Sequence, residues 1–384
     1  MTRRLKMAAS AHAYVRGSTV RFYEWLESAK HATVPEGPPV WICGDCHVGN
    51  LGPIASSAGK IEIQVRDLDQ TVIGNPAHDL IRLGLSLAMA ARSSDLPGVM
   101  TARIIEQLTD GYQATLSLDE ENNDPKVPTI IERALREAAH RSWRHLADER
   151  IEGAELAIPL GKRFWPLSDE ERAAIVDTFA QEDVRKLVCS LRSRDDDGAI
   201  RVLDAAYWRK GCSSLGRLRF AVLLALDVDG KQAARHCLMD VKEAIKAAAP
   251  RNEAVAMPDD NAERVVQGAR HLSPHLGCRM LPARLLGRSV FIRELLPQDL
   301  KLEIDALTRD EAMEVARYLG TVVGQAHARQ MSATDRDAWN KELARRRTDT
   351  LDAPPWLWSS VVDLVGAHEA AYLEHCHRYA LDAA

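Results

Sequence analysis

Two stretches decide the fold of this chain: VWICGDCHVGNLG at residues 40–52 and IEIQVRDLDQTVIGNPAHDLIRL at residues 61–83. Each begins with a short apolar run that predicts a strand, and each strand is followed by a carboxylate. Asp45 follows the first strand, with Asn50 five residues later, and Asp67 follows the second. Mg²⁺ prefers carboxylate and amide oxygens, and phosphoryl transfer needs a further acid near the nucleophile. These stretches therefore predict a site for a divalent cation and a phosphorylated ligand.

The alternative interpretation is that these acids and amides are ordinary turn residues, because Asp and Asn favour turns. The functional interpretation depends on three motifs around the predicted strands at 40–42 and 61–65, which are GD-x-H-x-GN, D-x-D and GNPAHDL. These motifs add His47, Asp69 and Asp79 as structural or substrate-side candidates. Their conjunction favours a functional site.

The composition argues against several classes of function. The chain of 384 residues has 50 Lys and Arg against 55 Asp and Glu, and its net charge of −5 gives no basis for broad nucleic-acid binding. No segment approaches the roughly 18 uninterrupted apolar residues of a membrane span, and the first residues lack the apolar stretch of a secretory signal. The seven Cys are scattered and form no disulfide framework. We therefore expect a cytoplasmic protein with no membrane partner.

Cys43, Cys46 and His47 also match the C-x-x-C-H spacing of c-type haem attachment. That interpretation requires export and an oxidising assembly compartment, and the sequence indicates neither. A thioredoxin-like dithiol and half of a zinc site are two further interpretations of the same residues. A zinc site would need four ligands, whereas the sequence offers neither a second C-x-x-C nor a nearby pair of histidines.

The sequence divides into four regions, which are 1–119, 120–205, 206–300 and 301–384. The first carries both site motifs, and the second is predicted to be a helical insertion or platform. The third alternates short apolar runs and turns around one helix, as in a small antiparallel sheet. The fourth returns to helix, with Thr308 and Glu311 in capping-box spacing. Arg16, before the first predicted helix, is a further substrate-side candidate, although a surface position is the simpler interpretation.

A second candidate site lies in the third region. Gly211 and Gly216 bracket a turn between two predicted strands, with Ser213 inside it, and the turn resembles one that covers phosphate groups. Lys242 lies on the following strand, and Glu263 lies on the helix after that. A lone glycine turn is usually only a hairpin and a lone strand lysine is usually solvated, so the signal is their combination.

The motifs around Asp45 and Asp67 resemble the catalytic and metal-binding segments of the aminoglycoside-phosphotransferase and protein-kinase-like fold, whose usual form is HGDxHxxN…IDxxxxxxGDPxxDL. The resemblance implies Asp45 as the catalytic base and Asn50 and Asp67 as Mg²⁺ ligands. It implies Asp79 as a buried acid that braces the catalytic loop. It also implies an ATP-binding set, which is Gly211, Ser213, Gly216, Lys242, Glu263 as ion-pair partner of the lysine, and Glu294 at an adenine-facing hinge. Two positions depart from the pattern, since Ser213 replaces the middle glycine and Cys43 replaces a frequent His.

The order of these motifs differs from that of an ordinary kinase. There the glycine loop and the lysine precede the catalytic loop, whereas here they follow it by more than 150 residues. A circular permutation accounts for this order, because the termini of a compact domain often lie close together. We therefore expect an α+β, two-lobed, circularly permuted protein-kinase-like fold with a small antiparallel sheet lobe and a larger helical lobe. Residues 206–300 would be the nucleotide-binding lobe, and residues 301–384 the hinge and remaining helices.

Nearly the whole chain also resembles a bacterial family known as domain of unknown function twenty-two fifty-two. The shared motifs are Y-x-RG at 14–17, CGD-x-H-x-GN, the glycine turn, a V-KEA strand, an RE-L strand end and a helix closing in AHAR at 326–329. This resemblance implies a family and no substrate.

The leading hypothesis is an ATP- and Mg²⁺-dependent phosphotransferase that acts on an acceptor hydroxyl. The first alternative is a nucleotide-binding regulatory module, or pseudokinase, without turnover, and Ser213 and the ambiguous helix glutamate motivate it. The second alternative is nucleotidyl transfer with the nucleotide bound in a flipped orientation. The acceptor is a small molecule, a protein or an RNA, and the sequence does not choose among them. Arg16 and Asp69 are the candidates for contact with it.

Overall fold

The computed structural model describes residues 8, 14–15, 17–28, 34–94, 96, 98–117, 126–150, 157–190, 194, 199–209, 216–227, 235–302, 307–345 and 352–379. Three candidate site residues, Arg16, Gly211 and Ser213, lie outside these described residues. The remaining candidates are all described, so the fold can be related to the predicted site residue by residue.

A six-stranded antiparallel sheet forms one half of the structure, in the order β5–β6–β7–β8–β10–β9. Its strands are β5 (Phe164–Trp165), β6 (Ala199–Trp208), β7 (Arg219–Asp227), β8 (Arg235–Glu243), β9 (Met280–Leu285) and β10 (Arg288–Glu294). Leu286 and Gly287 form the turn between β9 and β10, and both have positive φ, at 52° and 74°. A two-residue turn with two positive φ angles matches the twist of the strands that it joins.

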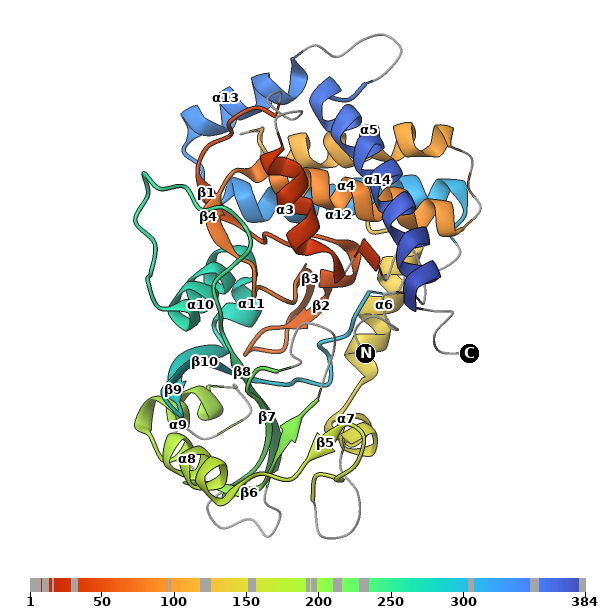
Figure 1. The fold of residues 1–384 in the computed structure, drawn as a ribbon. Helices are drawn as coiled ribbons and strands as arrows, with labels where there is room; N and C mark the ends of the chain where they lie inside the picture. The colour runs from red at the N-terminus through yellow and green to blue at the C-terminus, as the bar shows by residue number, and fades with distance from the viewer. Residues whose placement is uncertain are drawn as a thin grey trace.

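Different segments cover the two faces of this sheet. Helices α8 (Asp169–Phe179) and α9 (Glu182–Cys189) pack on one face, and α7 (Trp143–Arg150) packs on the other. Figure 1 shows α8 and α9 on one side of the sheet and α7 beside β5 on the other. Strand β7 is apolar along almost its whole length because both of its faces are buried.

The other half of the structure is helical. Its helices are α3 (Thr19–Glu27), α4 (Pro76–Ser93), α5 (Val99–Ala114), α6 (Thr129–His140), α12 (Arg309–Ala328), α13 (Ala333–Ala344) and α14 (Pro355–Tyr379). Helices α5 and α12 approach so closely that a Cβ on Gly111 would lie 1.9 Å from the carbonyl oxygen of Arg317. A Cβ on Gly320 would likewise lie 2.3 Å from the carbonyl oxygen of Leu108. The pair can therefore pack this closely only with glycine at both positions.

Two small two-stranded sheets complete the fold. Strand β1 (Val40–Ile42) pairs with β4 (Val72–Gly74), and β2 (Leu51–Ala55) pairs with β3 (Ile61–Val65). A 3-10 turn, η2 (Val48–Asn50), leads into β2. Figure 1 shows the β2–β3 hairpin between the helical half and the six-stranded sheet. These short strands carry the motifs that the sequence singled out.

Helices α10 (Asn261–Leu272) and α11 (Pro274–Gly277) also lie between the halves (Figure 1). Asp260 caps α10 by accepting hydrogen bonds from the first backbone N–H groups of the helix. A Cβ on Gly268 would lie 2.4 Å from the side chain of Thr71, so α10 lies directly against the loop after β3. This helix therefore joins the six-stranded sheet to the predicted metal-binding loop.

The structure confirms the α+β class, the predicted strands at 40–42 and 61–65, and the capping box of Thr308 and Glu311. Residues 51–55, between those strands, form a further strand, β2, that the sequence analysis does not include. Residues 120–205 are not only helical, since they include β5 and β6 begins at Ala199. No helix among the described residues is long and apolar enough to cross a bilayer.

Candidate functional site

The loop at residues 43–50, which follows β1, is held in place by a buried carboxylate. Asp79, on the first turn of α4, accepts hydrogen bonds from the backbone N–H of Cys43 at 2.7 Å and of Gly44 at 3.0 Å. Gly44 has φ of +72°, and a Cβ there would lie 2.1 Å from the carbonyl oxygen of Gln70. Tyr23 adds a hydrogen bond to the carbonyl of Gly44 at 2.6 Å. The 43–50 loop is therefore fixed from both sides.

A chain of buried side chains continues behind Asp79. His327 contacts Asp79 through Nε2 at 3.2 Å and the hydroxyl of Tyr112 through Nδ1 at 2.9 Å. Since a carboxylate only accepts, Nε2 carries the proton and Nδ1 accepts from Tyr112. The indole N–H of Trp339 donates to the same hydroxyl at 3.3 Å. Burial raises the pKa of Tyr112, which keeps this hydroxyl a donor.

Asp45 is paired with an arginine. Arg82, three residues after Asp79 on α4, donates to Asp45 Oδ1 from Nε at 3.1 Å and from Nη2 at 2.9 Å. The Asp45 side chain is 16% exposed, and its second oxygen lies 3.9 Å from Nε2 of His47. Burial raises the pKa of Asp45, and the Arg82 charge opposes that shift. Arg82 thus clamps one oxygen of Asp45, and Thr19 adds a further side-chain hydrogen bond to the carboxylate.

Asn50 connects the 43–50 loop to the end of β3. Its side-chain NH₂ donates to the backbone carbonyl of Asp45 at 3.0 Å. Its backbone carbonyl accepts from the backbone N–H of Arg66 at 2.8 Å. Since Asp67 directly follows Arg66, Asn50 ties the loop that carries Asp45 to the segment that carries Asp67. The structure therefore brings these three predicted residues into one region.

Lys242 of β8 reaches this region from the six-stranded sheet. Its ammonium group pairs with Asp67 at 3.3 Å and, more closely, with Asp69. Burial alone would raise the pKa of Asp67, but the charges of Lys242, Arg293 and Arg219 hold it well below its usual range. Burial and the neighbouring charge of Asp67 raise the pKa of Asp69. Lys242 is 4% exposed and Asp67 is 43% exposed, so this cluster opens to solvent through Asp67.

The expected pair of Lys242 with Glu263 is absent from the described residues, which corrects that part of the prediction. Glu263 lies on the exposed N-terminal turn of α10, because its backbone N–H is used by the Asp260 cap. The next residue, Arg264, is buried and donates to the carbonyl oxygens of Thr71, Asp69 and Ile245. Burial lowers the pKa of Arg264 to about 10. Helix α10 thus contributes a loop-bracing cation, a role that no sequence motif indicated.

Two arginines flank Lys242 on the same face of the sheet. Arg219 is directly opposite Lys242 in the β7–β8 register, and it forms a two-point ion pair with Asp240 at 2.6 and 2.9 Å. Arg293 donates to Asp240 at 3.2 Å and to the carbonyl of Arg66 at 3.0 Å. This second contact holds the residue before Asp67. The sequence motifs around Lys242 indicated neither arginine.

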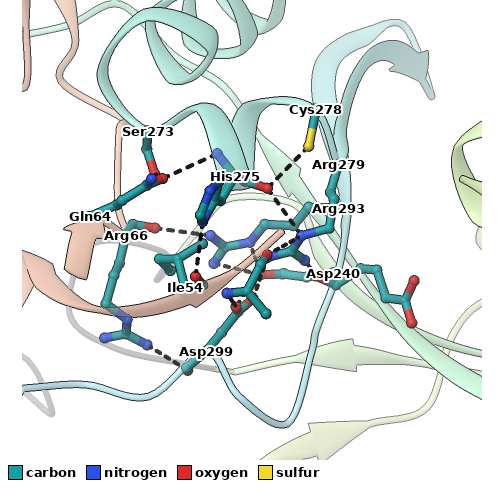
Figure 2. Close-up of polar contacts among 12 residues, drawn as sticks. Ile54, Gln64, Arg66, Asp240, Ser273, His275, Cys278, Arg279, Arg293 and Asp299 are labelled. Atoms are coloured by element: carbon teal, nitrogen blue, oxygen red, sulfur yellow. Dashed lines mark hydrogen bonds and ion pairs between the residues drawn. The ribbon is translucent and has the colours of Figure 1, made fainter. Parts of the chain in front are cut away.

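Figure 2 shows how Arg279 and Asp299 extend this network toward the β2–β3 hairpin. Arg279 donates to Asp299 at 2.9 and 3.0 Å and to the carbonyl of Ala55 at the end of β2 at 3.0 Å. Arg66 donates to the carbonyl of Asp299 at 3.2 Å. Because these donors come from both halves, the hairpin that ends at Asp67 is fixed relative to the sheet that carries Lys242.

A second set of contacts in Figure 2 holds the same hairpin to α11. The side-chain oxygen of Gln64, on β3, accepts from the hydroxyl of Ser273 at 3.0 Å and the backbone N–H of His275 at 3.1 Å. The ring of His275 contacts the carbonyl of Ile54 at 3.3 Å. Both strands of the hairpin are therefore attached to the helix after α10.

The Glu294 side chain is not directed to an open ligand position. It forms a buried ion pair with Arg194, at 2.8 Å from Nη1, and its carbonyl accepts from Arg279 at 3.1 Å. Burial raises the pKa of Glu294. The next residue, Leu295, packs in an apolar cluster with Leu146 of α7. The Glu294 side chain is thus taken up by Arg194, and its place at an adenine-facing hinge stays a prediction.

Cys43 and Cys46 are buried free thiols. A hydrogen bond with the Cys46 side chain, together with burial, raises the pKa of Cys43 well above its usual range. Thiols of this kind are poor metal ligands and poor nucleophiles, because both roles need the thiolate. Within the described ranges, no three His, Cys, Asp or Glu side chains form a group that could hold a metal ion.

The sequence matches one family model over residues 1–378, described as an uncharacterized protein conserved in bacteria. The chain belongs to the DUF2252 family. This confirms the family prediction made from the Y-x-RG, CGD-x-H-x-GN and AHAR motifs. No curated protein and no solved structure matches the chain. The kinase-like resemblance therefore stays a prediction.

Two of the family motifs take part in the contacts of this DUF2252 protein. The His of the AHAR motif is His327, which supports Asp79, and the Lys of the V-KEA strand is Lys242. Gly216, the described end of the glycine turn, has φ of +84° with nothing within 4 Å of a Cβ, so backbone conformation explains the glycine. The motifs thus mark buried support as well as the candidate site.

Proposed function

We propose that this protein is an ATP- and Mg²⁺-dependent phosphotransferase that acts on an acceptor hydroxyl. The observation that carries the proposal is the cluster of Lys242 with Asp67 and Asp69, beside Asp45 and Asn50. These groups come from opposite halves of the structure and meet at a boundary that opens to solvent through Asp67. A buried lysine, an exposed carboxylate and a separate acid suit phosphoryl transfer, which depends on positioning and charge neutralisation.

In this proposal Asp45 orients the acceptor hydroxyl and accepts its proton. Burial raises the pKa of Asp45, which makes it a better base, while Arg82 holds one of its oxygens. Asp79 fixes the backbone on which Asp45 lies. The role of Arg82 is therefore to orient the base.

Asp67 and Asn50 would hold Mg²⁺. Both offer side-chain oxygens, and Asp67 is partly exposed and ionised because of the cations around it. Mg²⁺ is often bound by one or two protein groups together with substrate phosphates, so the lack of a three-residue cage among the described side chains agrees with this role. Oδ1 of Asp69 is buried and has no partner within the described part of the chain, which leaves one more acceptor. Bound Mg²⁺ would neutralise charge on the phosphates.

Lys242 would contact the phosphates of ATP. In the structure its charge is balanced by Asp67 and Asp69, so a metal that binds Asp67 would free part of that charge for a phosphate oxygen. Arg219 and Arg293 are held by Asp240 and would keep the surroundings positive. The site is thus charged for a polyanionic ligand that arrives with a cation.

Calorimetry with ATP, with and without Mg²⁺, tests the proposal on the wild type and on the variants Lys242→Ala and Asp67→Asn. We expect binding that needs Mg²⁺ and that each substitution weakens about tenfold or more. Lys341→Ala and Asp337→Asn are matched controls, because these residues form an exposed ion pair on α13. An absence of ATP binding by the wild type under both conditions would refute the proposal, as would equal affinity in the site and control variants.

A nucleotide-binding module without turnover is the second candidate. The observation in its favour is that the lysine–helix-glutamate pair is missing from the described residues and that α7 covers Leu295 at the hinge. Prolonged incubation with ATP, Mg²⁺ and a panel of hydroxyl acceptors separates the two. Bound ATP that is recovered intact would favour the module, whereas transfer of the γ-phosphate that is lost in Asp45→Asn would favour the enzyme.

A further inference from the structure

A cavity of about 1070 Å³ lies in the helical half, among residues separate from those of the candidate site. Its walls are the proline-rich segment at residues 34–39, helix α13 and the N-terminal turn of α14. Its lining residues are Val34, Pro35, Glu36, Gly37, Pro38, Pro39, Asn252, Asp335, Ala338, Trp339, Glu342, Arg345, Pro355, Trp356, Trp358 and Ser359. The volume is at the upper end of the range for small-molecule sites, roughly 300–1,000 Å³.

The cavity combines aromatic rings with an excess of negative charge. Trp339 and Trp356 are 2% and 7% exposed, with ring centroids 6.4 Å apart, and the less buried Trp358 lines the same cavity. Among the described lining residues three carboxylates face a single guanidinium, which gives this set a formal balance of −2. The N–H of the Trp356 indole is buried without an acceptor among the described residues. This buried donor calls for an acceptor, such as an ordered water molecule in the cavity.

The carboxylates of the lining are not equally occupied. Asp335 is used in the capping box of α13, and Glu342 is 3.4 Å from Arg345 at the end of that helix. Glu36 is exposed and forms no ion pair with any other described residue. Glu36 is therefore the carboxylate of the lining whose charge no described cation balances, whereas Glu342 shares its charge with Arg345.

Two contacts connect the cavity walls to the candidate site. Trp339 donates to the hydroxyl of Tyr112, which begins the buried chain through His327 to Asp79. Asn75, the N-cap of α4, donates to the carbonyl of Pro35 at 2.8 Å and so ties the proline-rich wall to the same helix. The cavity walls are thus linked to the residues that hold the 43–50 loop.

We propose that this cavity binds a small organic ammonium cation. Indole rings attract cations through their π faces, and carboxylates at the same opening add attraction that an inorganic anion or a neutral apolar molecule would not gain. A compact alkylammonium group also satisfies a lining that is both apolar and acidic, because its carbon atoms contact the rings while its charge remains near the carboxylates. The site is separate from the proposed transfer reaction and does not depend on it.

Saturation-transfer NMR tests the proposal, with tetramethylammonium as the probe and tert-butanol as its neutral counterpart of similar size. We expect tetramethylammonium to bind at least about fivefold more tightly, the ratio that a cation–π contact of roughly 1 kcal/mol gives. In Glu36→Gln/Glu342→Gln and in Trp358→Leu that preference should fall toward one. Both variants alter incompletely buried side chains, and thermal unfolding checks that they fold as the wild type does.

Glu369→Gln is the matched control, because Glu369 is an acid on α14 that pairs with Arg92 and lies ten residues beyond the last lining residue. It should leave the preference unchanged. Equal binding of the two probes, no binding of either, or a preference that persists in the double variant would overturn the proposal. Loss of the preference in Glu369→Gln would also overturn it, since the effect would then follow overall charge.

Discussion

Replacing Asp79 by Asn tests how strongly the 43–50 loop depends on one buried carboxylate. The carboxylate accepts from the backbone N–H groups of Cys43 and Gly44, at 2.7 and 3.0 Å, and from the ring of His327. An Asn side chain has one oxygen, so one of the two N–H groups must face an NH₂ group whichever way the amide lies. The substitution changes shape very little, and the loss therefore isolates the hydrogen bonds.

The size of the effect follows from those contacts. A hydrogen bond to a charged group contributes roughly 1.5–3 kcal/mol, and a buried donor left unsatisfied costs about 1–3 kcal/mol. In Asp79→Asn at least one of these hydrogen bonds is lost, and the new NH₂ group then faces a backbone N–H, which is also a donor. We therefore expect the free energy of unfolding to fall by about 3 kcal/mol, a large part of the stability of a typical domain.

Urea unfolding followed by tryptophan fluorescence measures this change, with Asp337→Asn as the control. Asp337 is exposed on α13 and pairs with Lys341 at the surface, so its loss should cost less than about 0.5 kcal/mol. Hydrogen exchange adds a local readout, because the N–H groups of Cys43 and Gly44 should exchange faster in Asp79→Asn alone. Equal unfolding midpoints in the two variants, with unchanged exchange at these amides, would refute the reasoning.

Three further predictions follow from other contacts. Gly268→Ala should destabilise the protein by about 1–3 kcal/mol, because the added Cβ would lie 2.4 Å from the side chain of Thr71. Gly366→Ala, where α14 leaves open space, should stabilise it by about 0.5–1 kcal/mol, and thermal unfolding of both variants measures the difference. Arg264→Met should lower the free energy of unfolding in urea by about 2–4 kcal/mol, because three carbonyl oxygens lose their donor. Glu263→Gln should change it by less than about 0.5 kcal/mol, and similar losses in the two variants would contradict the bracing role of Arg264. Burial lowers the pKa of His78 from 6.5 to about 4, so the unfolded chain binds more protons in that interval and stability falls as the pH drops through it. His78→Phe should recover about 2 kcal/mol of the loss between pH 7 and 4.5, and an unchanged loss would exclude this histidine as its source.

The parts of the structure that could be predicted are those that short-range sequence determines. The strands at 40–42 and 61–65 are apolar runs bounded by turn residues, and the Thr308 capping box needs only four consecutive residues. The strand at 51–55 was missed because LGPIA contains Gly and Pro, which disfavour strands. This segment is a strand because it pairs with β3, which follows after a turn, and its own residues do not indicate that pairing.

The parts that could not be predicted depend on how distant elements meet. Glu263 and Arg264 are adjacent on one helix, and only the docking of α10 on the loop after β3 decides which of them faces inward. His327 belongs to a motif noted in the sequence, but its partner Asp79 is 248 residues away. Arg82 was passed over inside an apolar helical run, although a lone arginine in such a run must find a buried partner. That last signal was present and can be used for related chains.

The chain order of the two halves does not by itself argue against the proposed reaction. Lys242 and Asp67 are 175 residues apart, and they meet because β8 and the β2–β3 hairpin are each held by further contacts. Arg293 and Arg279 come from the sheet half and attach to the backbone of Arg66 and Ala55 in that hairpin. These contacts depend on the docked geometry, and none of them requires the lysine to precede the acid in the chain. A kinase-like site assembled in the reverse order therefore needs the same side chains and the same docking, with only the connections between the halves altered.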